Sequence, residues 1–280
     1  MTPRGAAERI VCLVPSLTEA LFSLGLGSRV VGVTEWCVHP AEGVAALPKV
    51  GGTKNPDVPA IVSLRPDLVL ANREENMRRD VERLERAGLQ VWVTYPRTVR
   101  EGAALLREIA DLGASADAVR AVVEPVERAV ADAERALGSR GSRPVRVFCP
   151  IWRDPWMSVG ADTYAHDLLR LCGGENVFGE RGDRRYPRVA LEDVVAARPE
   201  VVLLPDEPYR FEEADARELA ALPIPCRGRI HRIDGTLVSW YGPRIARAVE
   251  TIRALLAPSP PDAGPCPVDG QNGSRAPAPR

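Results

Sequence analysis

The segment that most constrains the fold of this 280-residue chain runs from Ser115 to Gly138 and reads SADAVRAVVEPVERAVADAERALG. Its apolar residues recur mostly at intervals of three and four, the spacing of one face of a helix. A helix of about 24 residues would be roughly 36 Å long, which is enough to join two lobes. Pro125 lies inside the segment, so a bend or break is expected there. The helix is predicted either to bridge two structural units or to belong to a bundle.

Strand-like and helix-like segments alternate on both sides of this helix, which is typical of parallel βαβ units. Strands are predicted at 10–14, 30–34, 68–71, 89–94, 145–149 and 229–233, and the last helix at 243–256. The expected fold class is therefore α/β, with two Rossmann-like lobes that contain parallel sheets and are joined by one long interlobe α-helix. The boundaries follow as an N-terminal lobe at 1–114, the bridging helix at 115–138, a C-terminal lobe at 139–257 and a Pro/Gly/Ser-rich tail at 258–280 that is predicted to be disordered.

An internal repeat supports two similar lobes. IVSLRPDLVLA at 61–71 and VVAARPEVVLL at 194–204 share a helix end, an Arg-Pro pair, an acidic residue and an apolar strand. Proline ends each helix because it cannot donate the next backbone hydrogen bond, and the strand follows. Repetition at this scale indicates that each half of the chain folds to the same plan.

Charge and composition exclude several classes of protein. Lys plus Arg number 37 against 38 Asp plus Glu, so the formal charge of −1 gives no support for binding to nucleic acid. No apolar run approaches the roughly 18 residues needed to cross a bilayer, and the N-terminus lacks the pattern of a signal peptide. We therefore expect no membrane insertion and a cytoplasmic location, or a periplasmic or cell-surface one if the start is truncated. The six cysteines form no CxxC pair, which argues against structural zinc and a disulfide framework.

Several segments resemble a known family. VPSLTEALFSLGL, RPDLVLA, the long helix, LLRLCGGENVF and RPEVVLL are similar to segments of the helical-backbone (class III) substrate-binding proteins of bacterial ABC importers for vitamin B12 and iron chelates. The resemblance covers about 9–256 and is strongest to the cobalamin-binding branch, although the chain lacks the usual signal peptide. It implies two α/β lobes, a rigid interlobe helix, a small ligand held between the lobes and, for an exported protein, an ABC permease as partner. It implies no required cofactor.

Five loops are expected to meet between the lobes, because ligand groups in open α/β sheets follow the carboxyl ends of strands. Flat indole rings in these loops suit a large planar ligand such as a corrin. The alternative is that the tryptophans only cover the sheet ends and that the arginines form ordinary loop salt bridges. The predicted ligand-binding residues are Trp36, His39, Asn72, Trp152, Arg153, Trp156, Tyr209, Trp240 and Arg244.

Cys37 and His39 are candidate metal ligands, since residues two apart in an extended segment point the same way. Packing or capping is the alternative role for both, and His39 could also be an axial ligand to a cobalt or iron held in a macrocycle. Docking of a permease in this family uses one acidic residue on each lobe. The candidates are Glu74 or Glu75 and Glu207 or Glu212.

The sequence predicts a binding protein and not an enzyme, because it contains none of the nucleophile, phosphate-loop, zinc-protease or dinucleotide motifs. Cobalamin or another metal chelate is the expected ligand, bound by a monomer whose lobes rock only slightly. The alternatives are a cytoplasmic carrier or sensor of a corrinoid or metal complex, and an enzyme that acts on such a cofactor.

Overall fold

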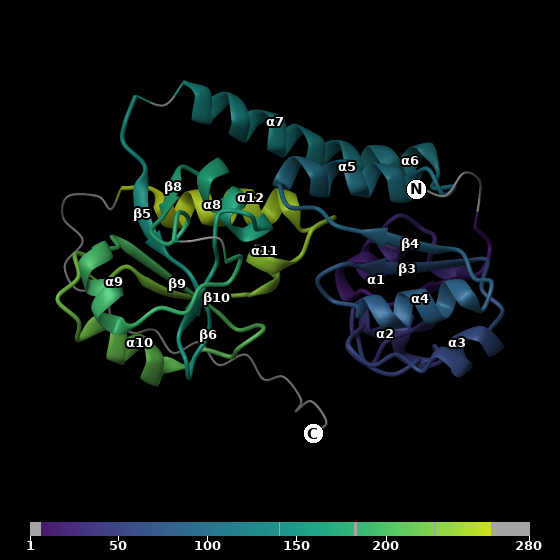
Figure 1. Cartoon of the computed structure of the whole chain (residues 1–280). Helices are drawn as coiled ribbons and strands as arrows, with labels where there is room; N and C mark the ends of the chain where they lie inside the picture. Colours follow the sequence, from purple (N-terminus) through teal and green to yellow (C-terminus); the bar gives the residue numbers. More distant parts are fainter. Residues whose placement is uncertain (1–6, 140, 182–183, 227, 259–280) are drawn as a thin grey trace.

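The computed structural model describes residues 7–139, 141–181, 184–226 and 228–258, and it consists of two α/β lobes beside a layer of helices (Figure 1). Each lobe contains a four-stranded parallel sheet, in the order β2-β1-β3-β4 in the N-terminal lobe and β10-β9-β5-β8 in the C-terminal lobe. A short antiparallel pair, β6-β7, adjoins the second sheet. The predicted fold class is confirmed. The strands are β1 (Ile10–Cys12), β2 (Val30–Val33), β3 (Leu68–Asn72), β4 (Val91–Thr94), β5 (Val145–Phe148), β6 (Pro150–Trp152), β7 (Met157–Ser158), β8 (Gly174–Asn176), β9 (Val201–Pro205) and β10 (Ile230–Ile233).

Helices connect these parallel strands, as parallel pairing requires. Those of the first lobe are α1 (Pro15–Ser23), the 3₁₀ turn η1 (Gly27–Arg29), α2 (Ala41–Ala45), α3 (Val58–Ser63), α4 (Arg78–Arg86) and α5 (Val99–Ala110). Those of the second lobe are α8 (Tyr164–Leu171), α9 (Leu191–Ala197), α10 (Glu213–Ala220), α11 (Thr236–Ser239) and α12 (Ile245–Leu256).

The predicted repeat has the same geometry in both lobes. Helices α3 and α9 end at Ser63 and Ala197, and each is followed by an arginine with φ of 48°, Arg65 or Arg198, before strand β3 or β9 begins. The acidic residue of each repeat then accepts a hydrogen bond from the backbone N–H at the start of the neighbouring strand. Asp67 accepts from Arg9 at 3.1 Å and Glu200 from Arg146 at 3.0 Å. The repeated sequence therefore encodes the pairing of the two central strands in each sheet.

The bridging segment forms an uninterrupted helical stretch made of α6 (Ala116–Ala118), the π-helical turn η2 (Val119–Val123) and α7 (Glu124–Gly138). The Ser115 side chain caps its start by accepting a hydrogen bond from Ala118 N–H at 3.1 Å. Pro125 cannot donate to the carbonyl four residues earlier and would clash with it, and the π-turn opens the ladder at that place. The proline is thus accommodated by a local widening of the helix.

The helix layer joins the lobes through a shared apolar core. Buried Val126, Val130 and Ala133 of α7 belong to one hydrophobic cluster that contains residues of both sheets and of α5, α8 and α12. Helices α5 and α7 lie side by side across both lobes (Figure 1). Because packed interiors resist deformation, this layer limits the movement of one lobe against the other.

No helix in the described ranges is long and apolar enough to cross a membrane. The predicted disordered tail falls almost entirely on 259–280, outside the described residues.

Candidate ligand-binding site between the lobes

Loops from the two lobes meet at the carboxyl ends of the strands. We call this surface the interlobe face and define it by loops 34–40 and 72–76 of the first lobe and loops 152–156, 206–211 and 234–244 of the second. The ring of His39 packs edge-on against Trp240 with 5.9 Å between their centroids, so the first and the last of these loops touch. The predicted meeting of loops between the lobes is therefore observed in part of the interlobe face.

Arg244 links the lobes at one side of this face. Its guanidinium donates to both oxygens of Glu19 on α1 at 2.7 and 2.8 Å and to Thr236 Oγ1 at 2.6 Å. It also lies 4.7 Å above the ring of Trp240, and its hydrogen bonds to Glu19 raise its pKa. Partners within the chain thus occupy three of the five N–H donors of Arg244, and its role as a ligand contact stays a prediction.

Glu74 forms a second link between the lobes. Its Oε1 accepts hydrogen bonds from Arg185 at 2.8 Å and from the Tyr186 hydroxyl at 2.6 Å, both from the loop between β8 and α9. Arg185 also pairs with Asp162 at 2.9 Å and contacts Tyr95 of the first lobe. Two charged links thus fix the spacing of the lobes without any ligand.

Tryptophans remain uncovered on both sides of the interlobe face. Trp36 of the first lobe is 66% exposed and Trp152 of the second lobe is 43% exposed, which is high for side chains of this size. Trp152 packs edge-on against Tyr209 at 5.6 Å, and Tyr209 contacts Phe211 at 4.8 Å. These aromatic rings offer apolar area to a ligand between the lobes.

Trp156 and Arg153 make their contacts within the second lobe. Trp156 is buried and stacks on Phe211 with 5.6 Å between centroids and an interplanar angle of 11°, so it belongs to the core of the second lobe. Arg153 pairs with Asp215 and Glu218 on α10. These contacts agree with the alternatives of a tryptophan that covers the sheet and a loop salt bridge, and a contact of either residue with ligand stays a prediction.

Asn72 organises its own loop. Its side-chain amide donates to Thr94 O and Oγ1 at 3.1 and 3.2 Å, and its side-chain oxygen accepts from Glu74 N–H at 2.8 Å. The neighbouring Asn76 also orders this loop. Its side-chain oxygen accepts a hydrogen bond from Asn72 N–H at 2.7 Å, and its side-chain amide donates to Thr53 O at 2.9 Å. The polar atoms of Asn72 are thus engaged in shaping the 72–76 loop, and a contact of Asn72 with ligand stays a prediction.

Cys37 is not available to a metal ion. Its segment is a turn rather than a strand, with Cys37 N–H bonded to Thr34 O at 3.1 Å, and its fully buried thiol contacts Thr18 and Thr34 hydroxyls at 3.2 and 3.1 Å. Burial raises the pKa of this thiol. His39 lies apart from it, against Trp240. No group of three or more His, Cys, Asp or Glu within the described ranges could hold a metal ion.

Two carboxylates, one from each lobe, complete the interlobe face. Glu75 is half-buried, and within the described ranges its carboxylate has no hydrogen bond or ion pair. Burial raises the pKa of Glu75 to about 7; Lys54 opposes this shift, and the charges of Glu207 and Glu74 add to it. Glu207 accepts a hydrogen bond from Ser239 Oγ at 2.7 Å, and burial raises its pKa as well. Sequence reasoning selected Glu75 only as a permease contact, and Glu207 both as a permease contact and as a carboxylate that could accept hydrogen bonds from amide groups of a ligand.

The docking role of Glu74, Glu75, Glu207 and Glu212 stays a prediction, but the structure separates the four. Glu74 is engaged in an interlobe link, and the pKa of Glu75 is raised by burial and further by the charge of Glu207. Glu212 is exposed at the start of α10, where its N–H donates to Asp215 at 2.7 Å. Glu212 is thus the member of the set most accessible to another protein.

Sequence reasoning missed Glu19, Arg185 and Tyr186. Glu19 lies one turn into a helix, and the other two follow a short strand in an arginine-rich loop. No local pattern marks them, since their importance comes from partners on the other lobe.

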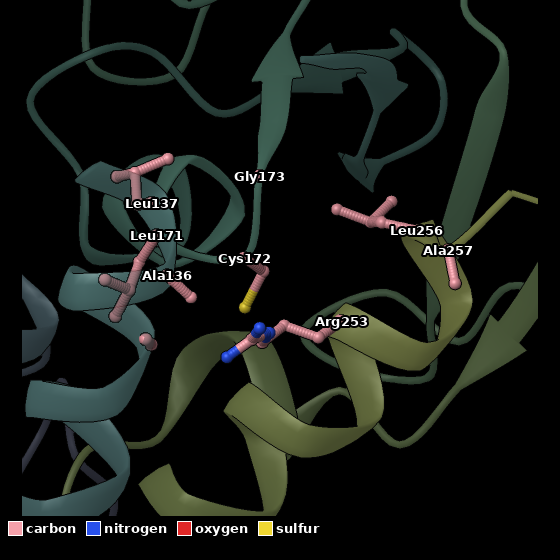
Figure 2. A pocket seen from close by; sticks show the side chains of 9 residues that line it. Ala136, Leu137, Leu171, Cys172, Gly173, Arg253, Leu256 and Ala257 are labelled. Atoms are coloured by element: carbon pink, nitrogen blue, oxygen red, sulfur yellow. The ribbon is translucent and has the colours of Figure 1, made fainter. Parts of the chain in front are cut away.

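A separate apolar pocket of about 210 Å³ lies on the helix layer, lined by the ends of α7, α8 and α12 (Figure 2). The Cys172 sulfur and the Arg253 guanidinium point into it, beside Leu137, Leu171 and Leu256. Its volume is below the 300–1,000 Å³ range that is usual for small-molecule sites. It lies outside the interlobe face and does not contribute to the candidate site.

The fold and the loops between its lobes define a two-lobe binding protein with a rigid helical connection. The chain belongs to the periplasmic binding protein family, whose sequence profile matches residues 10–219. It is 27% identical to the vitamin B12-binding protein of Yersinia pestis (strain Pestoides F), over 92% of this chain and 89% of that protein. The resemblance to class III substrate-binding proteins is therefore confirmed.

Solved structures support the same relationship. The periplasmic vitamin B12 binding protein of Vibrio cholerae superposes with a TM-score of 0.77 at 23% identity, covering 90% of this chain and 98% of that chain. A periplasmic heme-binding protein in complex with two hemes gives a TM-score of 0.71 at 27% identity, covering 90% and 100% of the two chains. These relatives are named as binding proteins rather than enzymes.

Proposed function

We propose that this chain holds cobalamin or another planar metal chelate between its lobes and delivers it to the permease of an ABC importer. The observation that carries the proposal is the pair of exposed tryptophans, Trp36 and Trp152, in loops of opposite lobes. The names of the curated relative and of the heme-binding structure support a tetrapyrrole-like ligand. The permease as partner follows from the family.

The aromatic rings suit such a ligand for a physical reason. An indole that gains about 100 Å² of apolar contact stabilises a complex by roughly 2.5 kcal/mol. A corrin or porphyrin is broad and flat, so it can cover one ring from each lobe, whereas a small polar ligand would leave them in water. The two charged links hold the lobes apart at a fixed spacing, which reduces the ordering cost of binding.

Spectroscopic titration of the purified full chain tests the proposal. Cyanocobalamin, dicyanocobinamide and haemin each have intense visible bands that report binding, and calorimetry gives the affinity. Trp36→Ala and Trp152→Ala should each weaken binding by roughly tenfold to a hundredfold. Val62→Ala removes an exposed apolar side chain on α3, outside the interlobe face, and should leave the affinity unchanged. Failure of the parent chain to bind any of the three compounds would refute the proposal.

His39 is the proposed contact to the chelated metal ion. Its half-buried ring against Trp240 lies on the interlobe face, where the imidazole could reach an axial position of a bound macrocycle. His39→Ala should then alter the visible spectrum of the complex. An unchanged spectrum with retained binding would show that the imidazole is not a ligand.

A further inference from the structure

On the interlobe face, two arginines are paired with carboxylates of the chain, whereas two carboxylates have no such partner among the described residues. The two arginines are neutralised within the chain, Arg244 by Glu19 and Arg153 by Asp215 and Glu218. Arg185, outside the defined loops, is likewise paired with Glu74 and Asp162. Arg210 of loop 206–211 is exposed, and Arg73 lies over the Tyr95 ring at 4.9 Å. The carboxylates of Glu75 and Glu207 are not neutralised in this way.

Both carboxylates lie on loops that are ordered by hydrogen bonds of neighbouring residues. The 72–76 loop that carries Glu75 is fixed by the side chains of Asn72 and Asn76. Glu207 bonds to Ser239 and packs so closely against Gly235 that a Cβ there would lie 2.5 Å from Glu207 Cγ. Gly235 is in turn held by a 2.7 Å hydrogen bond from its N–H to Asp206. The Glu207 side chain is thus held by its hydrogen bond, and the loop that carries Glu75 has a fixed backbone, so the two carboxylates belong to ordered loops of opposite lobes.

We infer that Glu75 and Glu207, one from each lobe, make this site select a planar metal chelate whose rim carries amide N–H groups over one whose rim carries free carboxylates. The inference rests on the proposed function and narrows its ligand class to amidated corrinoids. An ionised carboxylate accepts strong hydrogen bonds from amide N–H groups. A carboxylate on the ligand is repelled by the carboxylate of the protein, and both groups lose hydration without gaining a hydrogen-bond donor in exchange. Specificity by such repulsion is a common device of binding sites.

The surrounding charges give the selectivity a dependence on pH. Lys54 is the cation that acts on Glu75, while Glu74 and Glu207 oppose its ionisation. The buried groups Tyr241, Cys12 and Cys37 also face Glu75 and stay neutral, because burial raises the pKa of each. Glu75 carries its charge above about pH 7 and loses it below. Rejection of carboxylate-bearing ligands should therefore be stronger at alkaline than at acid pH.

A matched pair of ligands isolates the effect of the rim. Dicyanocobinamide and dicyanocobyrinic acid share the corrin ring and the cobalt, but the rim of the second carries free carboxylates in place of amides. Calorimetric titration of the full chain at about pH 8 and about pH 6, on either side of the pKa of Glu75, should show tighter binding of the amide form and a larger preference at the higher pH.

Variants assign that preference to the two carboxylates. Glu75→Gln and Glu207→Gln should each reduce it by about tenfold at the higher pH, mainly by improving the binding of the carboxylate form. The paired control, Glu85→Gln with Glu192→Gln, removes one exposed carboxylate from each lobe outside the interlobe face and should leave the preference unchanged. Binding of both corrins with the same preference in all variants would overturn this inference alone. Absence of binding to cobinamide, cyanocobalamin and haemin alike would overturn the proposed function itself.

Discussion

The contact between Arg244 and Glu19 offers the sharpest test of how the lobes are held together. Replacing Arg244 by Met keeps most of the aliphatic stem and removes the charge, and Glu19→Gln removes the opposite charge with little change in shape. With the double variant these form a cycle that isolates the coupling energy of the pair. Arg244 and Glu19 are 225 residues apart in the sequence, so their coupling energy measures how strongly α1 associates with the start of α12.

The expected magnitude follows from burial and geometry. The pair is bidentate at 2.7 and 2.8 Å, with side chains only 18% and 19% exposed. Exposed pairs couple by about 0–1 kcal/mol, and breaking a fully buried pair costs about 3–5 kcal/mol. For this intermediate case we expect a coupling of about 2 kcal/mol. Arg244 also loses its contacts to Thr236 and the Trp240 ring, so Arg244→Met alone should be more destabilising than Glu19→Gln.

Urea unfolding followed by circular dichroism measures the four free energies of unfolding. The natural control is Arg107–Glu127, which joins α5 to α7 with the same bidentate geometry at 2.9 and 2.7 Å but with side chains 36% and 42% exposed. Its coupling should be about 0.5 kcal/mol. If the coupling of Arg244 with Glu19 is no larger than that of the control, burial at the interlobe contact does not strengthen the pair and the reasoning is refuted.

Two further predictions concern titration and thiol access. Hydrogen bonds from Arg143 lower the pKa of Glu200 to about 2 from an ordinary 4.5, so its stabilisation is complete above about pH 4.5 and is lost as the pH falls towards 2. Glu200→Gln should thus lower the free energy of unfolding by about 1 kcal/mol at about pH 7, a small value because Arg143 is largely exposed. The loss should be smaller at about pH 3, and an equal loss at the two pH values would contradict the assignment of the lowered pKa to Glu200. In a Cys266→Ser background the native protein should not react with Ellman's reagent until it unfolds, because its remaining cysteines are buried: Cys12, Cys37, Cys149, Cys172 and Cys226. Rapid modification of one thiol, mapped to Cys37 by mass spectrometry, would instead show that the loop of Cys37 opens in the native protein.

Much of the architecture was predictable because it depends on local chemistry. The period of Val126, Val130 and Ala133 indicates a helix face, and the duplicated Arg-Pro-acidic unit marks the same helix-to-strand connection at Arg65 and Arg198. Proline geometry, capping and apolar periodicity act over a few residues, so they can be read without knowledge of the rest of the chain. The same holds for the loops that follow strands, which supplied Trp36, Trp152 and Tyr209 as candidates for the site.

The roles of individual side chains depended on tertiary structure. Trp156 and Trp152 lie four residues apart in one loop, yet one stacks in the core on Phe211 and the other is exposed. A single turn after Thr34 directs Cys37 inward, away from His39.

What the sequence alone determined is thus the two-lobe α/β plan and the loops from which its site is built. Which arginines are already paired was decided only by the meeting of Glu19 with Arg244 and of Glu74 with Arg185, and the same tertiary structure leaves Glu75 and Glu207, on opposite lobes, without an ion pair among the described residues. The physical reason is range: propensities and caps act between neighbours in sequence, whereas charge and burial depend on neighbours in space, and these come from opposite lobes.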